Sequence, residues 1–391
     1  MSEYEKLGVS AHKKEVHQAI RQLPPSDIPY TFARIILQKG RAHALHLDTA
    51  GTKPALAYLY WKETGTLAAW QWVAQDAIVM NIDDLAVTGF TGPFMIASNI
   101  ARNKHCIPAE VIQTIISENQ RYCQWLTNKG FPCRVAGGET ADVGDIVRTI
   151  DVGITAYADA PPESVKAVRI QPGDVIIGIA SEGDFDGPDG PHYNSGIGCN
   201  GLTLARHAVL RAEYGQKYPE TVAPETPKSS AYRGRRLLTD TLETPAGSRT
   251  VAELLLAPTA TYLPVLAPLS HHLKKYIHGM IHCTGGGQTK VMHFLQKVRV
   301  VKDNLFPVPK VFQMIQQEGN IPWKEMYRVF NMGHRLEIYI APEKADEAIR
   351  IIQDSGYRAQ KIGYCQPAHR PEVEVHVPNT DQNPIYYAYN S

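Results

Sequence analysis

The segment that most constrains the fold is Ala42–Lys53, with the sequence AHALHLDTAGTK. Its small and apolar residues predict a buried strand that ends at the carboxylate of Asp48. A short turn follows, containing Gly51, Thr52 and Lys53, and the next residue is a proline, which suits the first position of a helix. Free backbone N–H groups, a hydroxyl, an ammonium and a carboxylate at a helix start could bind a phosphate and a divalent cation. An ordinary surface turn has the same composition, so both interpretations stay open here.

Length and composition exclude several classes of protein. The chain has 391 residues, with 40 basic and 39 acidic side chains and a formal net charge of +1. It therefore has no overall basic field for nucleic acid. No apolar run reaches the roughly 18 residues of a membrane span, and the polar N-terminus is unlike a signal peptide. Six cysteines without paired spacing are typical of reduced thiols. We expect a cytoplasmic protein with no nucleic-acid or membrane partner.

Strands and helices alternate along the chain, which predicts an α/β fold. After a polar, helical stretch over residues 1–40, we expect strands at 42–48, 93–97, 134–136 and 147–157 and helices at 54–63, 67–87 and 108–129. Later strands are expected at 174–180, 275–283, 333–340 and 359–364, with a helix at 342–354 and a long loop at 182–201. A double proline within 158–172 marks a linker. The predicted domains are residues 1–165 and 166–391.

Three further motifs carry candidate ligand-binding groups. Asp83 and Asp84 add carboxylates on the helix predicted at 67–87. GGET at 137–140 follows a short predicted strand, where its glycines would let backbone approach a ligand and Glu139 could bind a metal or an amine. CTGGG at 283–287 precedes a predicted helix, whose first N–H groups favour an anion. Both glycine-rich segments are also consistent with tight structural turns.

Other polar clusters have plainer interpretations. Asp184, Asp186 and Asp189 do not match the spacing of a calcium-binding loop, and favour a solvated loop or a lid that orders a substrate. His278 and His282 lie on a predicted strand without a third ligand nearby, and are interpreted as structural. No pairing of Ser or Cys with His indicates covalent catalysis.

Nine motifs occur in one order: LDTAGTK, IDDLAVTG, GGETADVGD, GDVIIGIAS, CNGLTLAR, LLAPTATY, HCTGGG, EMYRVFNMG and KIGY. In this order they resemble the phosphoribosylformylglycinamidine cyclo-ligase (AIR synthetase) family over residues 42–364. The resemblance implies a two-domain α+β type of fold and a homodimer whose N-terminal domains form a shared barrel. It also implies ATP and Mg²⁺ as cofactors. The implied reaction of purine biosynthesis closes formylglycinamidine ribonucleotide (FGAM) to aminoimidazole ribonucleotide (AIR), after ATP phosphorylates the formamide oxygen.

Carried onto this chain, the resemblance implies roles for individual residues. The metal would be held by Asp48 and Asp84. The ATP-binding set would be Asp48, Gly51, Thr52, Lys53, Asp84, Gly137 and Gly138. Catalytic roles would fall to Lys53, Glu139, His192 and Asn200. The substrate phosphate is expected at the remaining glycine-rich anion sites, namely Asn200, Gly201, Gly285, Gly286 and Gly287.

The chain departs from the family pattern at several positions. Thr49 replaces a glycine of the first motif, and Asp83 replaces an asparagine, which predicts a more acidic site. The histidine before the Asn-Gly pair is replaced by Cys199, so His192 upstream is the candidate substitute. A glycine-rich N-terminal loop is absent. These departures keep two alternatives open. One is a related ATP-using enzyme of the thiamine-monophosphate kinase, selenophosphate synthetase or hydrogenase-maturation type. The other is a non-catalytic nucleotide-binding protein.

Overall fold

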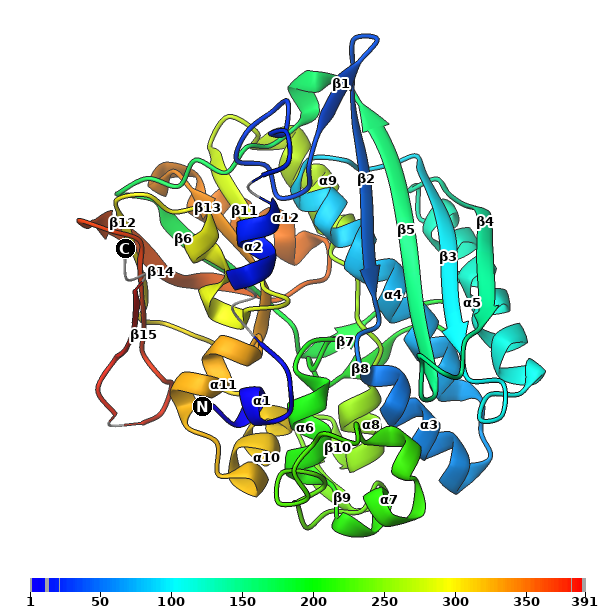
Figure 1. Cartoon of the computed structure of the whole chain (residues 1–391). Helices are drawn as coiled ribbons and strands as arrows, with labels where there is room; N and C mark the ends of the chain where they lie inside the picture. The colour runs from blue at the N-terminus through cyan, green and yellow to red at the C-terminus, as the bar shows by residue number, and fades with distance from the viewer. Residues whose placement is uncertain (1, 11–13, 21, 381, 389–391) are drawn as a thin grey trace.

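Two β-sheets, one from each half of the chain, form the framework of the protein (Figure 1). The structure is a computed structural model that describes residues 2–10, 14–20, 22–380 and 382–388. Helices pack on and between the sheets, so the α/β architecture expected from the sequence is confirmed. Within these described ranges, no helix is long and apolar enough to cross a membrane.

The first sheet has five strands in the order β1-β2-β5-β3-β4. They are β1 (Ile36–Gln38), β2 (Arg41–Thr49), β3 (Phe94–Arg102), β4 (Cys133–Asp142) and β5 (Ile150–Ala160). β3 and β4 run parallel, and the other neighbours are antiparallel. The register places Thr49, Gly153, Asn99 and Glu139 in one row across four strands. Glu139 is therefore three strand spacings from the end of β2, roughly 14 Å.

Helices cover only one face of this sheet. The helices of the first half are α3 (Lys53–Thr64), α4 (Ala68–Val87) and α5 (Ala109–Asn128). α4 packs against β2 and β5, and α5 packs against β4. The side chains that alternate to the other face remain in solvent, since Leu45, Leu47 and Met95 are 68%, 61% and 47% exposed. The uncovered side of the sheet is hereafter called the open face.

The second sheet has seven strands in the order β11-β13-β6-β14-β12-β15-β16. They are β6 (Val175–Ala180), β11 (Ile277–His282), β12 (Val298–Lys302), β13 (His334–Ile340), β14 (Ala359–Pro367), β15 (Glu372–Val375) and β16 (Ile385–Ala388). Two helices, α9 (Leu263–His272) and α12 (Ala345–Asp354), pack together beside it. α4 contacts α9 and β11 as well as the first sheet, so this one helix joins the two halves.

Shorter elements complete the chain. The helices are α1 (Glu3–Lys6), α2 (Lys14–Ile20), α6 (Leu202–Val209), α7 (Ala212–Lys217), α8 (Val251–Leu256), α10 (Lys310–Gly319) and α11 (Trp323–Val329). The strands are β7 (Gly183–Phe185), β8 (His192–Asn194), β9 (Thr241–Thr244) and β10 (Gly247–Thr250). Four 3₁₀ turns lie at Pro162–Ser164, Pro219–Thr221, Gly287–His293 and Pro342–Lys344.

Several expected elements are wrong in ways that affect the site. GGET does not follow a strand but lies inside β4, because β3 pairs with β4 along its whole length. No α-helix follows CTGGG: Gly286 and Gly287 have positive φ angles of 92° and 50°, and only a 3₁₀ turn begins there. The loop expected at 182–201 contains the hairpin of β7 and β8. Residues 147–149 precede β5, and residues 2–10, 14–20 and 22–40 contain only α1, α2 and β1.

The end of α6 buries a histidine that should make the fold sensitive to acid. Burial first, and then the adjacent Arg206 charge, lower the pKa of His207 from 6.5 to about 3. The folded state therefore favours the neutral ring. Its contribution to stability is complete above the unfolded pKa of 6.5 and is lost as the pH falls toward 3.

We expect the free energy of unfolding to fall by about 2 kcal/mol from this group between neutral pH and about pH 5, at roughly 1.4 kcal/mol per unit. Urea unfolding of the wild type and of His207→Gln at both pH values measures it. The substitution should reduce the acid loss by that amount, and an unchanged acid loss would contradict the assignment.

Candidate functional site

The two halves meet at the buried carboxylate of Asp84, near the end of α4. Its side chain is held from both sheets. His282 at the end of β11 donates from Nδ1 to Asp84 Oδ1 at 2.6 Å. His46 on β2 brings Nε2 to 3.4 Å from Asp84 Oδ2. Asp84 itself is only 5% exposed. The site is therefore assembled from a helix and from one strand of each sheet.

Arg335 on β13 fixes the protonation of His282. Its Nε donates to His282 Nε2 at 3.2 Å. A neutral imidazole that accepts at Nε2 carries its proton at Nδ1, which is the atom facing Asp84. The guanidinium also lies over the ring of Tyr262, 4.8 Å from its centroid. Arg335 and His282 therefore hold Asp84 in one orientation.

The pKa values of the two carboxylates, Asp84 and Asp48, are shifted in opposite directions. Burial raises the pKa of Asp84, but Lys290 and the hydrogen bonds from His282 and His46 hold it well below its ordinary value. Asp48 at the end of β2 has a raised pKa, through burial first and then through the Asp84 charge. Burial alone would lower the pKa of His46, yet its bond to Asp84 raises it. A further cation beside Asp48 would be stabilised here.

Lys290 is a functional candidate that the sequence analysis did not single out. It lies in the 3₁₀ turn after the triple glycine, and its charge lowers the pKa of both Asp48 and Asp84. Its Nζ donates to Thr284 Oγ1 at 2.5 Å and lies 4.5 Å from the ring centroid of Phe32. The available signal was a lysine three residues after a glycine turn already suspected of binding an anion.

Asp83 does not make this site more acidic. Thr261 Oγ1 donates to its Oδ1 at 2.6 Å, and the Tyr262 N–H donates to both oxygens at 3.2 and 3.1 Å. Burial raises the pKa of Asp83. Its carboxylate therefore joins α4 to the second half.

Lys53 lies elsewhere than its motif suggests. The ammonium is completely buried, 2.8 Å from Asp76 Oδ2. It also donates to the carbonyl oxygens of Ala257 at 2.6 Å and of Gly198 at 3.3 Å. An ammonium has three N–H groups, and these three partners use all of them. Through the two carbonyl oxygens, Lys53 therefore connects the turn after β2 to the second half of the chain.

The turn after β2 packs against the loop before α6. A Cβ on Gly51 would lie 3.3 Å from the Cys199 carbonyl oxygen, and Thr52 Oγ1 lies 2.8 Å from Thr203 Oγ1. The Asn200 amide lies 3.7 Å from a Cβ built on Gly285. The structure therefore brings together the first motif, the Asn-Gly pair and the triple glycine.

Packing explains two of the predicted phosphate-binding glycines, and backbone conformation explains a third. A Cβ on Gly201 would lie 2.4 Å from the Phe330 ring, and one on Gly287 would lie 2.6 Å from the Phe330 carbonyl oxygen. Gly286 has a positive φ of 92°. Only Gly285 is exposed and without such a constraint.

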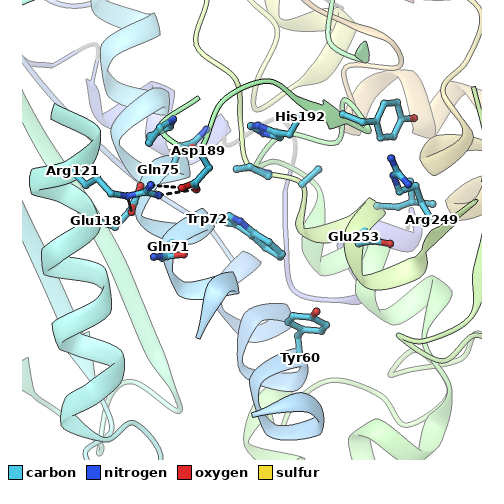
Figure 2. A pocket seen from close by; sticks show the side chains of 15 residues that line it. Tyr60, Gln71, Trp72, Gln75, Glu118, Arg121, Asp189, His192, Arg249 and Glu253 are labelled. Carbon is cyan, nitrogen blue, oxygen red and sulfur yellow. Dashed lines mark hydrogen bonds and ion pairs between the residues drawn. The ribbon is translucent and has the colours of Figure 1, made fainter. Parts of the chain in front are cut away.

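Two groups of predicted site residues lie apart from Asp84. Gly137, Gly138 and Glu139 are exposed on β4, and Glu139 accepts only from the N–H of its neighbour Thr140, at 2.9 Å. His192 on β8 lines another cavity of about 510 Å³. Figure 2 shows His192 above Trp72, with Arg121 bonded to Asp189 beside it. None of the side chains that bond Asp84 lines that cavity.

One cluster in the described chain has the residue types of a metal site. Cys283, His334 and Glu337 lie within 4.8 Å of one another and are buried. However, Lys302 forms an ion pair with Glu337, and His334 and the Tyr339 hydroxyl bond the same carboxylate at 2.9 and 2.6 Å. The cluster is therefore an internal ion-pair network. Asp48 and Asp84 remain the candidate metal ligands.

Several curated proteins are similar to this chain over most of its length. The phosphoribosylformylglycinamidine cyclo-ligase of Chromobacterium violaceum is 28% identical, over 84% of this chain and 81% of its own. The enzyme of the same name from Carboxydothermus hydrogenoformans is also 28% identical, over 83% and 80%. That from Burkholderia mallei is 27% identical, over 89% and 84%.

Solved structures show the same fold at low identity. "AaThiL complexed with AMPPCP and TMP" has a TM-score of 0.54 at 12% identity and covers 97% of both chains. "T. maritima PurL complexed with ADP" also has a TM-score of 0.54, at 13% identity, over 96% of this chain and 49% of that one. Residues 31–159 match the N-terminal domain of the family described as AIR synthase related protein, and residues 171–376 match its C-terminal domain. The chain therefore belongs to the AIR synthase related protein family.

Proposed function

We propose that this chain is an ATP-dependent cyclo-ligase that converts FGAM to AIR, ADP and phosphate. The observation that carries the proposal is its similarity to curated cyclo-ligases over more than four fifths of both chains. The site supports it, because both halves contribute charged groups around Asp84. A reaction between ATP and a second substrate needs such a site, in which two reactants are held in line.

Asp48 and Asp84 are the residues that would hold Mg²⁺. Carboxylate oxygens are the ligands this ion prefers, and the pKa of Asp48 is raised by burial and then by the Asp84 charge. When bound, the metal would neutralise the ATP phosphates during transfer to the formamide oxygen. The chain's own contribution is orientation: His282 and His46 fix Asp84, and Lys290 adds a positive charge on the side of the second half.

Of the other predicted site residues, Gly51 and Asn200 stay close to the proposed reaction site, and Lys53 has a different role. Gly51 and Asn200 lie where ATP and FGAM would meet, between the turn after β2 and the triple glycine. Lys53 would act by positioning this turn, because its N–H groups are already used. Gly137, Gly138 and Glu139 would contact the nucleotide only if it extended over the open face toward β4.

The open face supports a homodimer. Leu45, Leu47 and Met95 expose apolar side chains there, and a second copy placed face to face would remove them from water. Such a contact is self-complementary, as a two-fold dimer requires. Paired in this way, the two five-stranded sheets would form the shared barrel that the resemblance implies.

The reaction itself gives the first test. ADP release should require both ATP and FGAM, at a rate on the order of 1–10 per second. A coupled assay for ADP, with AIR measured separately, checks both products. Thiamine monophosphate in place of FGAM should give no ADP; release with that compound would indicate the related kinase. A folded protein that binds ATP and releases no ADP would indicate a non-catalytic role.

Asp84→Asn should lower turnover by at least about 100-fold, because a neutral amide holds a divalent cation poorly. The amide oxygen can still accept from His282, so the fold should persist. Steady-state kinetics and a thermal melt measure the two effects. Asp83→Asn is the comparison variant, since that side chain accepts from Thr261 and Tyr262 and lies 4.0 Å from His282 Nε2, whereas it makes no hydrogen bond to Asp84 in the described part of the chain. Equal losses in the two variants would contradict the metal-binding role.

Leu47→Arg should convert the dimer to a monomer, because it places a charge in the apolar contact. Size-exclusion chromatography with light scattering at micromolar concentration measures the mass. Ile116→Arg is the control, as this residue is 47% exposed on α5, on the covered side of the sheet. A wild-type monomer, or a dimer that survives Leu47→Arg, would argue against the open face as the interface.

A further inference from the structure

A second cavity, with a volume of about 440 Å³, lies against the turn after β2. Its walls are the turn itself, α6, the segment that leads into β5, and residues 7–9 of the N-terminal segment. Gly51 and Thr52 belong to the turn, and Thr203 and Arg206 belong to α6. The cavity thus adjoins the proposed reaction site. Asp151 lies on its wall, and burial and the charge of Asp48 raise the pKa of Asp151.

Arg206 is a buried cation without a counter-charge in the described part of the chain. It is 4% exposed, its Nε and Nη1 have no hydrogen-bond partner, and it forms no ion pair in the described part of the chain. Its Nη2 lies 3.2 Å from Nε2 of His207. However, the Tyr232 N–H donates to Nδ1 of that ring at 3.2 Å. Only one nitrogen of a neutral imidazole accepts, so one of these two contacts joins two donors.

Protein groups nearby do not complete this guanidinium. In the described part of the chain, the guanidinium also lies over the Tyr232 ring, with 5.7 Å between Arg206 Cζ and the ring centroid. The Glu220 carboxylate on the cavity wall accepts from the Tyr58 hydroxyl at 2.6 Å, and Arg148 donates to the carbonyl oxygens of Pro219 and Glu220. A buried charge without a counter-charge is strongly unfavourable, and a planar guanidinium is suited to a bidentate oxyanion.

We propose that this cavity binds the phosphate monoester of the substrate, with Arg206 as the principal contact and the Thr52 and Thr203 hydroxyls as further hydrogen-bond groups. The proposal rests on the proposed function, since FGAM carries a ribose 5′-phosphate. It moves the substrate phosphate from the triple glycine to the cavity between the turn after β2 and α6. Asp48 and Asp84 would then be left to the metal and ATP.

The test uses ribose 5-phosphate as the probe, with ribose as its phosphate-free counterpart. Isothermal titration calorimetry should detect ribose 5-phosphate binding to the wild type and no binding of ribose. Arg206→Gln should weaken the phosphate ligand at least about tenfold. It should also raise KM for FGAM by a similar factor while KM for ATP stays unchanged. Arg235→Gln is the matched control, because it removes the same charge from a guanidinium that is 80% exposed.

A purely structural role for Arg206 predicts a different pattern. It would lower the Tm of the ligand-free Arg206→Gln protein and change both KM values together, which would overturn the proposal. We expect the ligand-free variant to melt at or above the wild-type temperature, since an unpaired buried charge is removed. If Arg206→Gln does not fold, Arg206→Lys is tested in its place. Lysine keeps the positive charge but cannot make the bidentate contact of a guanidinium, so ribose 5-phosphate should bind more weakly than to the wild type.

Failure of this proposal and failure of the proposed function give different results. Equal binding of ribose 5-phosphate to wild type and variant, or no binding to the wild type, overturns the phosphate site even when FGAM-dependent ADP release is normal. Phosphate binding that depends on Arg206, without FGAM-dependent ADP release, overturns the cyclo-ligase activity and leaves the phosphate site in place.

Discussion

The buried ion pair of Lys53 and Asp76 fixes how the two halves of the chain meet. Both side chains are inaccessible to solvent, with 2.8 Å between Nζ and Oδ2. Thr259 donates to the other Asp76 oxygen through its N–H at 2.7 Å and its hydroxyl at 2.5 Å. Removing either charge would leave its partner buried and uncompensated, which costs about 3–5 kcal/mol. These contacts therefore fix the turn after β2, α4 and the segment after α8 relative to one another.

The position of α4 in turn determines what its two neighbouring aspartates do. Asp83 accepts hydrogen bonds from the segment before α9, and burial raises its pKa. Asp84, one residue later, points between β2 and β11, where two histidines and Lys290 keep it ionised. Adjacent residues on a helix point in directions about 100° apart. One motif thus supplies both a contact between the halves and a charged group of the site.

The sequence predicted those parts of this arrangement that depend on local pattern. α5 was recognisable from its amphipathic period and from the proline and glycine that bound it, and Asp48 and Asp84 from the order of motifs. The partners of these residues were not recognisable, because His282 is 198 positions from Asp84 and no local pattern encodes that contact. Likewise, the sequence Gly-Thr-Lys does not distinguish a lysine that binds a ligand from one that pairs with Asp76. GGET was misplaced since strand length depends on pairing with β3.

Buried charges in this protein separate into two kinds, and the difference indicates where ligands belong. Lys302 faces Glu337 and Lys53 faces Asp76, so each of these buried charges has an opposite charge beside it within the protein. Arg206 differs from these pairs, because in the described part of the chain it forms no ion pair and its Nε and Nη1 have no hydrogen-bond partner. Asp48, which is half-buried at the end of β2, also forms no ion pair with a described residue, although His46 and Lys290 lower its pKa. A folded protein tolerates a buried unpaired charge only where another interaction completes it. An anion would complete Arg206, and a cation would complete Asp48. Both residues lie near the turn after β2, so a phosphorylated substrate and a metal-bound nucleotide would be held beside the same turn.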